Sequence, residues 1–229
     1  MPAIVGGVVV VLIIIGGAFY FLGPGKSKKS GNSGGSAASK GWASGDVQTV
    51  SHDAVCRPIA GLAARLVPKA DPQPPPPPTR TDVATCRWAN LGKAHNRFRN
   101  LSVMVLPHSP SHGLDKDQPA AEVAKSAVRR TVQKNKDGPL GEKVQDSRSV
   151  PALGDEAAIV YSVGTTDAGI AHVVVRRGNV EMVITYQGRD SALRGSPAQG
   201  YYPVAKPLSR RAAEQGALAI ARRLVTEFR

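Results

Sequence analysis

Cys56 and Cys86 are the only thiols in this chain and its most informative candidates for chemistry. Two thiols in an exported domain most often pair. A disulfide closing this loop of about 30 residues would stabilise the fold by roughly 3–4 kcal/mol in the loop-entropy model. Two alternatives stay open, a catalytic thiol and a metal site. Arg57 next to Cys56 could lower the thiol pKa, but no His–Asn arrangement typical of a cysteine nucleophile is visible.

His108 and His112 form the only close histidine pair. Pro110 between them prevents a regular helix, so the two imidazoles need not face one metal ion. No third ligand accompanies them in the sequence. We therefore expect a polar surface loop here.

Two further groups of residues contain the residue types of catalytic sites. The run Ser51-His52-Asp53 contains the three residue types of a hydrolase triad, but consecutive residues cannot adopt triad geometry, so helix capping explains it better. Asp155 and Glu156 have the residue types of an acid–base pair, but adjacent carboxylates in a strand or turn point apart. We expect a structural turn at this position.

The histidines lie in segments with no recognisable nucleophile or metal motif beside them: His52, His95, His108, His112 and His172. We therefore predict no catalytic, cofactor-binding or metal-binding residues. The expectation is a protein that binds rather than catalyses.

Ala3–Leu22 is a run of apolar residues without a charged side chain. A helix of about twenty residues spans the ~30 Å hydrocarbon core of a bilayer. The aromatic residues at its end, Phe19–Phe21, are typical of a membrane–water boundary. A cleaved signal peptide is the competing interpretation, but the run is long for one and lacks a preceding basic region. We predict a transmembrane anchor over residues 1–25.

Residues 26–46 are rich in Gly, Ser and Lys and nearly devoid of apolar residues, which predicts a disordered linker. The orientation signals conflict. Lys26, Lys28 and Lys29 follow the span, which by the positive-inside rule favours a cytoplasmic C-terminal domain. The two cysteines and the linker favour the outside. We predict a single-pass protein of the cell membrane with an extracellular C-terminal domain.

The chain carries a net charge of +13. Residues 1–46 hold four lysines against one aspartate, which leaves about +10 on residues 47–229. Such a charge attracts anionic lipid, acidic envelope polymers or nucleic acid, or serves solubility alone. Nucleic acid is disfavoured because RNA-recognition aromatics, zinc spacing and a basic zipper are missing. Helical spacing places Arg211, Arg222 and Arg229 on one solvated face, a candidate contact for anions.

Residues 47–229 read as one α+β domain. Hydrophobic periodicity predicts a helix from Ser51 to Pro68, a second from Asp117 to about Asn135 and a third over Leu208–Phe228. Between the first two, a Pro-rich loop covers 71–79. The predicted strands are Thr85–Ala89, Phe98–Leu106, Glu156–Val163, Ile170–Arg176 and Val180–Tyr186. This α-ββ-α-βββ-α order predicts an antiparallel sheet packed by helices, a sandwich.

The ordered motifs carry a resemblance. They are Cys56 in the first helix, Cys86-Arg87-Trp88, Pro151–Ala157 and the hairpin Val174–Val180. In this order they resemble a family of actinobacterial envelope lipoproteins and membrane-anchored proteins of unknown function, whose related domains have a Mog1/PsbP-like sandwich. The resemblance covers nearly all of 47–229 and implies an exported, disulfide-bonded module without catalytic residues. The chain departs from the lipoproteins because it lacks the lipidated cysteine, which a span replaces.

Two classes of function follow. The favoured one is a membrane-anchored extracytoplasmic module that binds an envelope polymer, a lipid or a protein partner, with no cofactor. The alternatives are a hydrolase acting on envelope material and a basic domain that contacts anionic lipid or cell-wall polymer. Perturbed titratable groups in a concave pocket would favour the hydrolase.

Overall fold

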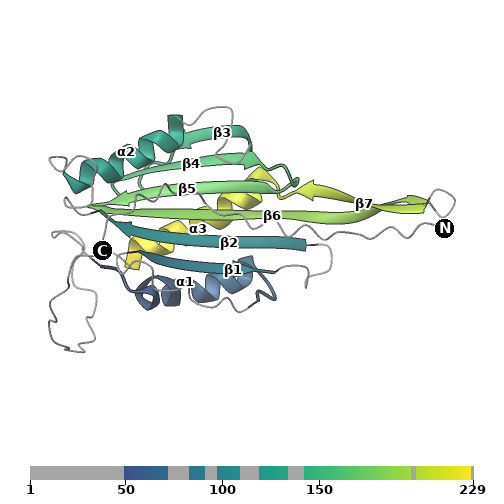
Figure 1. The fold of residues 1–229 in the computed structure, drawn as a ribbon, viewed down its shortest axis with the longest axis horizontal. Coiled ribbons are helices and arrows are strands. Elements are labelled where there is room, and N and C mark those ends of the chain that lie inside the picture. The colour runs from purple at the N-terminus through teal and green to yellow at the C-terminus, as the bar shows by residue number, and fades with distance from the viewer. Residues whose placement is uncertain are drawn as a thin grey trace, which may run out of the picture. The chain divides into compact units, whose positions relative to one another are not determined.

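A seven-stranded antiparallel sheet dominates the fold (Figure 1). In this computed structural model the described residues are 49–71, 83–90, 97–108, 119–133, 142–196 and 200–227, without the side chains of 120, 192–196 and 200–203. They belong to one compact unit, Ala38–Arg229. The predicted anchor, the linker and most of the Pro-rich loop lie outside the described residues.

Alternating apolar residues form most of the strands, as the sequence predicts. The strands are β1 (Ala84–Ala89), β2 (Arg97–Pro107), β3 (Lys143–Ser149), β4 (Glu156–Val163), β5 (Gly169–Arg177), β6 (Val180–Ser196) and β7 (Gly200–Pro207). Their order across the sheet is β1-β2-β6-β5-β4-β3. Strand β7 pairs with β6 over Arg189–Ser196, beyond the part of β6 that pairs with β5.

The predicted sheet was too small by two strands. Strand β3 was missed because its sequence is mostly polar. Strand β7 was missed because it contains Pro203 and Pro207, and proline is tolerated in a sheet mainly at edge strands. Strand β6 also continues to Ser196, ten residues beyond the predicted end at Tyr186. The apolar alternation of β6 ends at Tyr186, whereas the strand continues. The coarser prediction, an α+β fold with a helix-packed antiparallel sheet, is confirmed.

The helices are α1 (His52–Leu66), α2 (Ala120–Gln133) and α3 (Arg210–Glu227). Helices α1 and α3 pack together on one face of the sheet and share the main hydrophobic core with it. Helix α2 packs on β3, β4, β5 and β6, where Val128 joins a smaller cluster with Ala158 and Val174. The domain is therefore a three-layer sandwich with unequal outer layers.

Local sequence explains the start of α1. Ser51 accepts a hydrogen bond from the Ala54 backbone N–H at 3.2 Å, so the predicted cap is confirmed. Val55, Ile59 and Ala63 recur every four residues and are buried against the sheet. The last helix begins at Arg210 rather than Leu208, and Leu208 lies in the core before it.

Two tyrosines join the helical layer to the strands. The Tyr186 hydroxyl donates to the Leu66 carbonyl at the end of α1, and the Tyr161 hydroxyl donates to the Leu208 carbonyl before α3, each at 2.9 Å. Burial raises the pKa of both tyrosines. These bonds place the last turn of α1 and the start of α3 on the sheet.

No helix in the described ranges is long and apolar enough to cross a membrane. The predicted span, Ala3–Leu22, lies outside those ranges.

Candidate functional site

Helices α1 and α3 run antiparallel to each other. Arg223 near the end of α3 donates to the carbonyl of Pro58, in the first half of α1, at 3.4 Å. At the other end, Gly216 of α3 lies against Leu66 of α1 and the ring of Tyr186. A side chain at Gly216 would overlap that ring, so glycine permits the close packing.

The two helices carry exposed basic residues. Four exposed cations of α1, α3 and the turn after α1 have no ion-pair partner within the described ranges: Arg65, Lys69, Arg211 and Arg222. The other exposed arginines of the two helices are paired. Arg57 bonds Asp53 at 3.0 Å, and Arg223 bonds Glu227 at 2.6 Å. We call the four unpaired cations and the helix surface around them the basic helix layer.

This layer contains two of the three predicted anion contacts. Arg211 and Arg222 are both exposed, so the prediction that they are solvated is confirmed. Arg229 lies outside the described residues. Arg65 and Lys69 were missed because they belong to α1 and the turn after it, and the helix pairing that places α1 beside α3 is absent from a linear pattern.

The disulfide joins α1 to the sheet. Cys56 of α1 and Cys86 of β1 are bonded, with their Cα atoms 5.7 Å apart, so the predicted pairing is confirmed. Both cysteines are buried, and the bond leaves no thiol for catalysis. The bond therefore connects one helix of the basic layer covalently to the edge strand below it.

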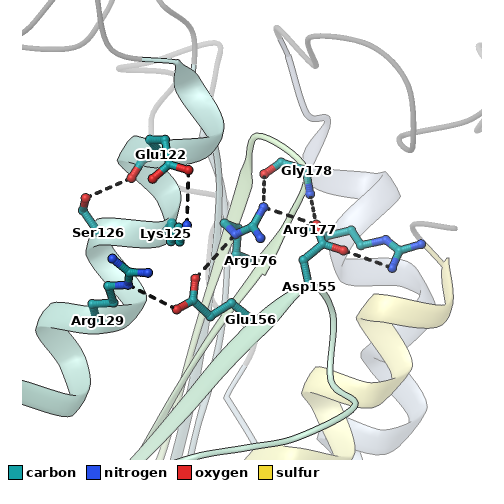
Figure 2. Close-up of polar contacts among 9 residues, drawn as sticks. All are labelled: Glu122, Lys125, Ser126, Arg129, Asp155, Glu156, Arg176, Arg177 and Gly178. Atoms are coloured by element: carbon teal, nitrogen blue, oxygen red, sulfur yellow. Dashed lines mark hydrogen bonds and ion pairs between the residues drawn. The ribbon is translucent and has the colours of Figure 1, made fainter.

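Asp155 and Glu156 serve different partners, as Figure 2 shows. Asp155 accepts from the Gly178 backbone N–H at 2.7 Å and from Arg176 at 3.3 Å, which closes the turn between β5 and β6. Glu156 instead faces Arg129 of α2 at 3.6 Å and Arg176 at 3.8 Å. The two carboxylates thus hold a turn and a helix in place and do not converge as an acid–base pair.

His108 also has a structural partner. Its Nε2 lies 2.8 Å from Glu181 Oε2, and its backbone carbonyl accepts from the Asn179 side chain at 2.8 Å. These contacts attach the end of β2 to the start of β6. His112 and His95 lie outside the described residues, so the polar surface loop expected between His108 and His112 stays a prediction.

A polar chain that sequence reasoning missed lies on the α2 face of the sheet. Ser162 donates to Glu142 Oε2 at 2.7 Å, and His172 Nε2 lies 3.4 Å from the same oxygen. His172 Nδ1 lies 3.0 Å from Thr185 Oγ1. The hydrogen bond with His172 holds the pKa of Glu142 below its ordinary value, and burial opposes this effect. The sequence did not predict this set of hydrogen bonds because its members come from three different strands and from the residue before β3.

Thr185, His172 and Glu142 are arranged in the order hydroxyl, imidazole, carboxylate, which resembles the order of a hydrolase triad. Strand β6 is paired on both sides around Thr185, with Ser102 of β2 and His172 of β5. The ladder therefore engages the backbone N–H groups that an oxyanion hole would need. Thr185, His172 and Glu142 thus form a hydrogen-bond chain whose hydroxyl lies within a strand paired on both sides.

A second ionic cluster anchors the start of α3. Arg148 of β3 donates two hydrogen bonds to Glu214, at 2.7 and 2.8 Å, and Arg210 donates to the same carboxylate at 3.0 Å. Asp146 contacts both arginines. The bonds from Arg148 hold the pKa of Glu214 below its ordinary value, despite burial. The charge of Arg210 is thereby paired with carboxylates, so Arg210 is not one of the unpaired cations of the basic helix layer.

No family model and no curated protein matches the chain.

Proposed function

We propose that the chain is a non-catalytic binding module of the cell envelope, of the kind found in actinobacteria, with a Mog1/PsbP-like domain outside the membrane and an N-terminal anchor. The observation that supports it best is the basic helix layer. Four exposed, unpaired cations lie on one layer of the domain, whereas Glu142, Asp155 and Glu214 are engaged with histidine, arginine or backbone partners.

The ligand that this layer fits is a phosphate-rich anion. Exposed guanidinium groups pair with phosphate oxygens in a planar, bidentate way. Each basic residue near an anionic surface contributes about 1 kcal/mol of attraction, which decays within a Debye length of about 8 Å at physiological salt. Two sources supply this chemistry in an envelope, lipid headgroups and anionic cell-wall polymers.

The disulfide supports the extracytoplasmic location, because such bonds form and persist in oxidising compartments. The hydrolase alternative has less support. Its best geometric candidate is the Thr185–His172–Glu142 chain, and the strand pairing around Thr185 engages the groups of an oxyanion hole.

The test uses the full chain in lipid nanodiscs, with a donor dye at the C-terminus and an acceptor dye on the lipid. One set of discs is neutral, and the other contains phosphatidylglycerol. We expect energy transfer to be higher in the anionic discs and to fall as salt is raised, because the attraction is screened. A soluble poly(glycerol phosphate) that lowers the transfer in anionic discs would identify the polymer as a competing ligand.

Two triple variants decide the test: each removes three positive charges, but from different parts of the domain. Changing Arg65, Arg211 and Arg222 to Gln removes three unpaired cations of the basic helix layer. Changing Arg87, Arg130 and Lys206 to Gln removes three exposed cations from β1, α2 and β7. Only the first variant should lose the response to anionic lipid. Equal transfer in both kinds of disc, together with no effect of the polymer, would contradict the anionic ligand, and failure of the chain to enter neutral discs would contradict the anchor.

A further inference from the structure

His52 lies beside the disulfide. It opens α1, and Cys56 follows four residues later, so helical periodicity places both side chains on the same side of the helix. Cys86 reaches this point from β1. A nitrogen of the His52 ring and the two sulfur atoms all lie within 4.8 Å of one another. Two independent elements thus bring three potential metal ligands together.

The fold itself makes little use of the His52 ring. Its side chain is 45% exposed, and its Nδ1 lies 3.6 Å from the exposed carboxylate of Asp53. An exposed pair of this kind contributes little to stability. The cap of α1 comes from Ser51, not from His52. A change of the His52 ring orientation toward the sulfurs would therefore cost little folding energy.

The donor set has a defined chemical preference. Two thiolates and one imidazole form a Cys₂His set, which binds Zn²⁺ in tetrahedral geometry and leaves a fourth position for water. The sulfurs of a disulfide have no thiolate charge and are poor ligands for zinc. Metal binding at this position therefore depends on the redox state of the pair.

We propose that the reduced form of the chain binds one Zn²⁺ through His52, Cys56 and Cys86. A dithiol reduces the disulfide by exchange: it supplies two electrons and two protons, becomes a disulfide itself and leaves two protein thiols. Zinc binding then releases both thiol protons, because the thiolate is the ligand. The same three residues thus hold α1 to β1 either through a covalent bond or through a metal ion.

Asp53 has a role in this site. Metal-bound histidines commonly donate their second ring N–H to a carboxylate, which orients the ring. Asp53 already lies beside Nδ1 of His52, which leaves Nε2 for the metal. The reduced site exists wherever the chain meets a dithiol or has not yet formed its disulfide. The proposal is independent of the basic helix layer, so its failure would leave the proposed function intact.

The experiment titrates Zn²⁺ into the full chain, solubilised in detergent, against a chromophoric zinc indicator. One sample is reduced with a dithiol that is then removed without air, and the other stays oxidised. We expect one tight zinc per reduced chain and none on the oxidised chain. Co²⁺ in place of zinc should give the visible absorption bands of a tetrahedral thiolate complex.

The variant His52→Ala separates this site from non-specific binding by two thiols. It leaves the disulfide intact, so the oxidised variant should unfold at the wild-type temperature. Loss of an outer-shell partner of a metal ligand typically lowers metal affinity roughly 10–100-fold. Loss of a ligand itself should cost more, so we expect the zinc affinity of reduced His52→Ala to fall by more than this. His108→Ala removes a histidine bonded to Glu181 instead and should leave zinc affinity unchanged.

Reduction of the disulfide is expected to destabilise the fold, so the unfolding temperature with and without zinc provides a second measurement of binding. Zinc should raise the unfolding temperature of the reduced wild type by several degrees, and it should not do so for reduced His52→Ala. Equal zinc affinity of the wild type and the His52 variant would overturn the three-ligand site. Absence of stoichiometric zinc on the reduced wild type would overturn it as well.

Discussion

Glu214 and Glu142 are both buried carboxylates with lowered pKa values, but they have opposite kinds of partner. Glu214 is held by two guanidinium groups, Arg148 and Arg210, on the α3 side of the sheet. Glu142 is held by a hydroxyl and an imidazole on the α2 side. A guanidinium stays charged at any pH that a protein survives, whereas an imidazole is charged only when protonated.

This difference shows how one fold uses the same residue type in two ways. The Glu214 cluster joins β3 to the start of α3 with several charge-assisted bonds, and those bonds in turn raise the pKa of Arg148. The Glu142 chain joins the residue before β3 to β4, β5 and β6 through single hydrogen bonds. We therefore expect the Glu214 cluster to contribute more stability.

The largest effect is expected for Glu214→Ala. This change leaves Arg148 and Arg210 with Asp146 alone and should lower the free energy of unfolding by about 2 kcal/mol. We expect less than for a fully buried pair, because the Arg148 side chain is 41% exposed and recovers water. Urea unfolding measures the change. Gln215→Ala, at the exposed neighbour, is the control, and an equally small effect of both would refute the importance of the cluster.

A smaller effect is expected for Glu142→Gln. The amide oxygen can still accept from Ser162, but the charge that faces His172 is lost, so the free energy of unfolding should fall by about 1 kcal/mol. A double-mutant cycle with His172→Gln measures the coupling between the two side chains. Independent effects of the two changes would show that the imidazole and the carboxylate do not interact.

The smallest effect is a change in the slope of stability with pH. Both carboxyl groups have pKa values below the ordinary 4.5 in the folded protein. A lowered folded pKa stabilises above the unfolded pKa, and this stabilisation is lost as the pH falls through the folded value. Wild type should therefore lose stability on acidification below about pH 5. Glu214→Gln and Glu142→Gln should each flatten that loss, and a slope identical to wild type would contradict the corresponding contact.

The parts of the fold that were predicted depend on local signals. The hairpin of β5 and β6, the cap at Ser51 and the stripes of the helices all follow from periodicity or turn residues within a short window. The Cys56–Cys86 pairing followed from there being two thiols only. In each case the information lies within the segment itself or in the count of one residue type.

The missed features depend on register and packing. Strand β3 has polar residues on both sides, and only its position at the sheet edge makes it a strand. Glu142 meets Ser162 and His172 because the pairing of β3 with β4, and of β4 with β5, brings the residue before β3 to these strands, which no local pattern contains. The helix pairing that adds Arg65 to the basic layer is likewise a long-range result. These properties arise when segments assemble, so a linear pattern does not reveal them.

Gly169 and Gly188 face each other across β5 and β6, at the point where the chain leaves β7 toward α3. A methyl group at Gly169 would overlap the Leu208 backbone carbonyl, and one at Gly188 would overlap the backbone of Phe98. Neither obstacle is a side chain that could rotate away. Any homologue that keeps this crossing should therefore keep both glycines around a hairpin of β-branched residues. That spaced pair offers a fingerprint for finding distant relatives of this chain.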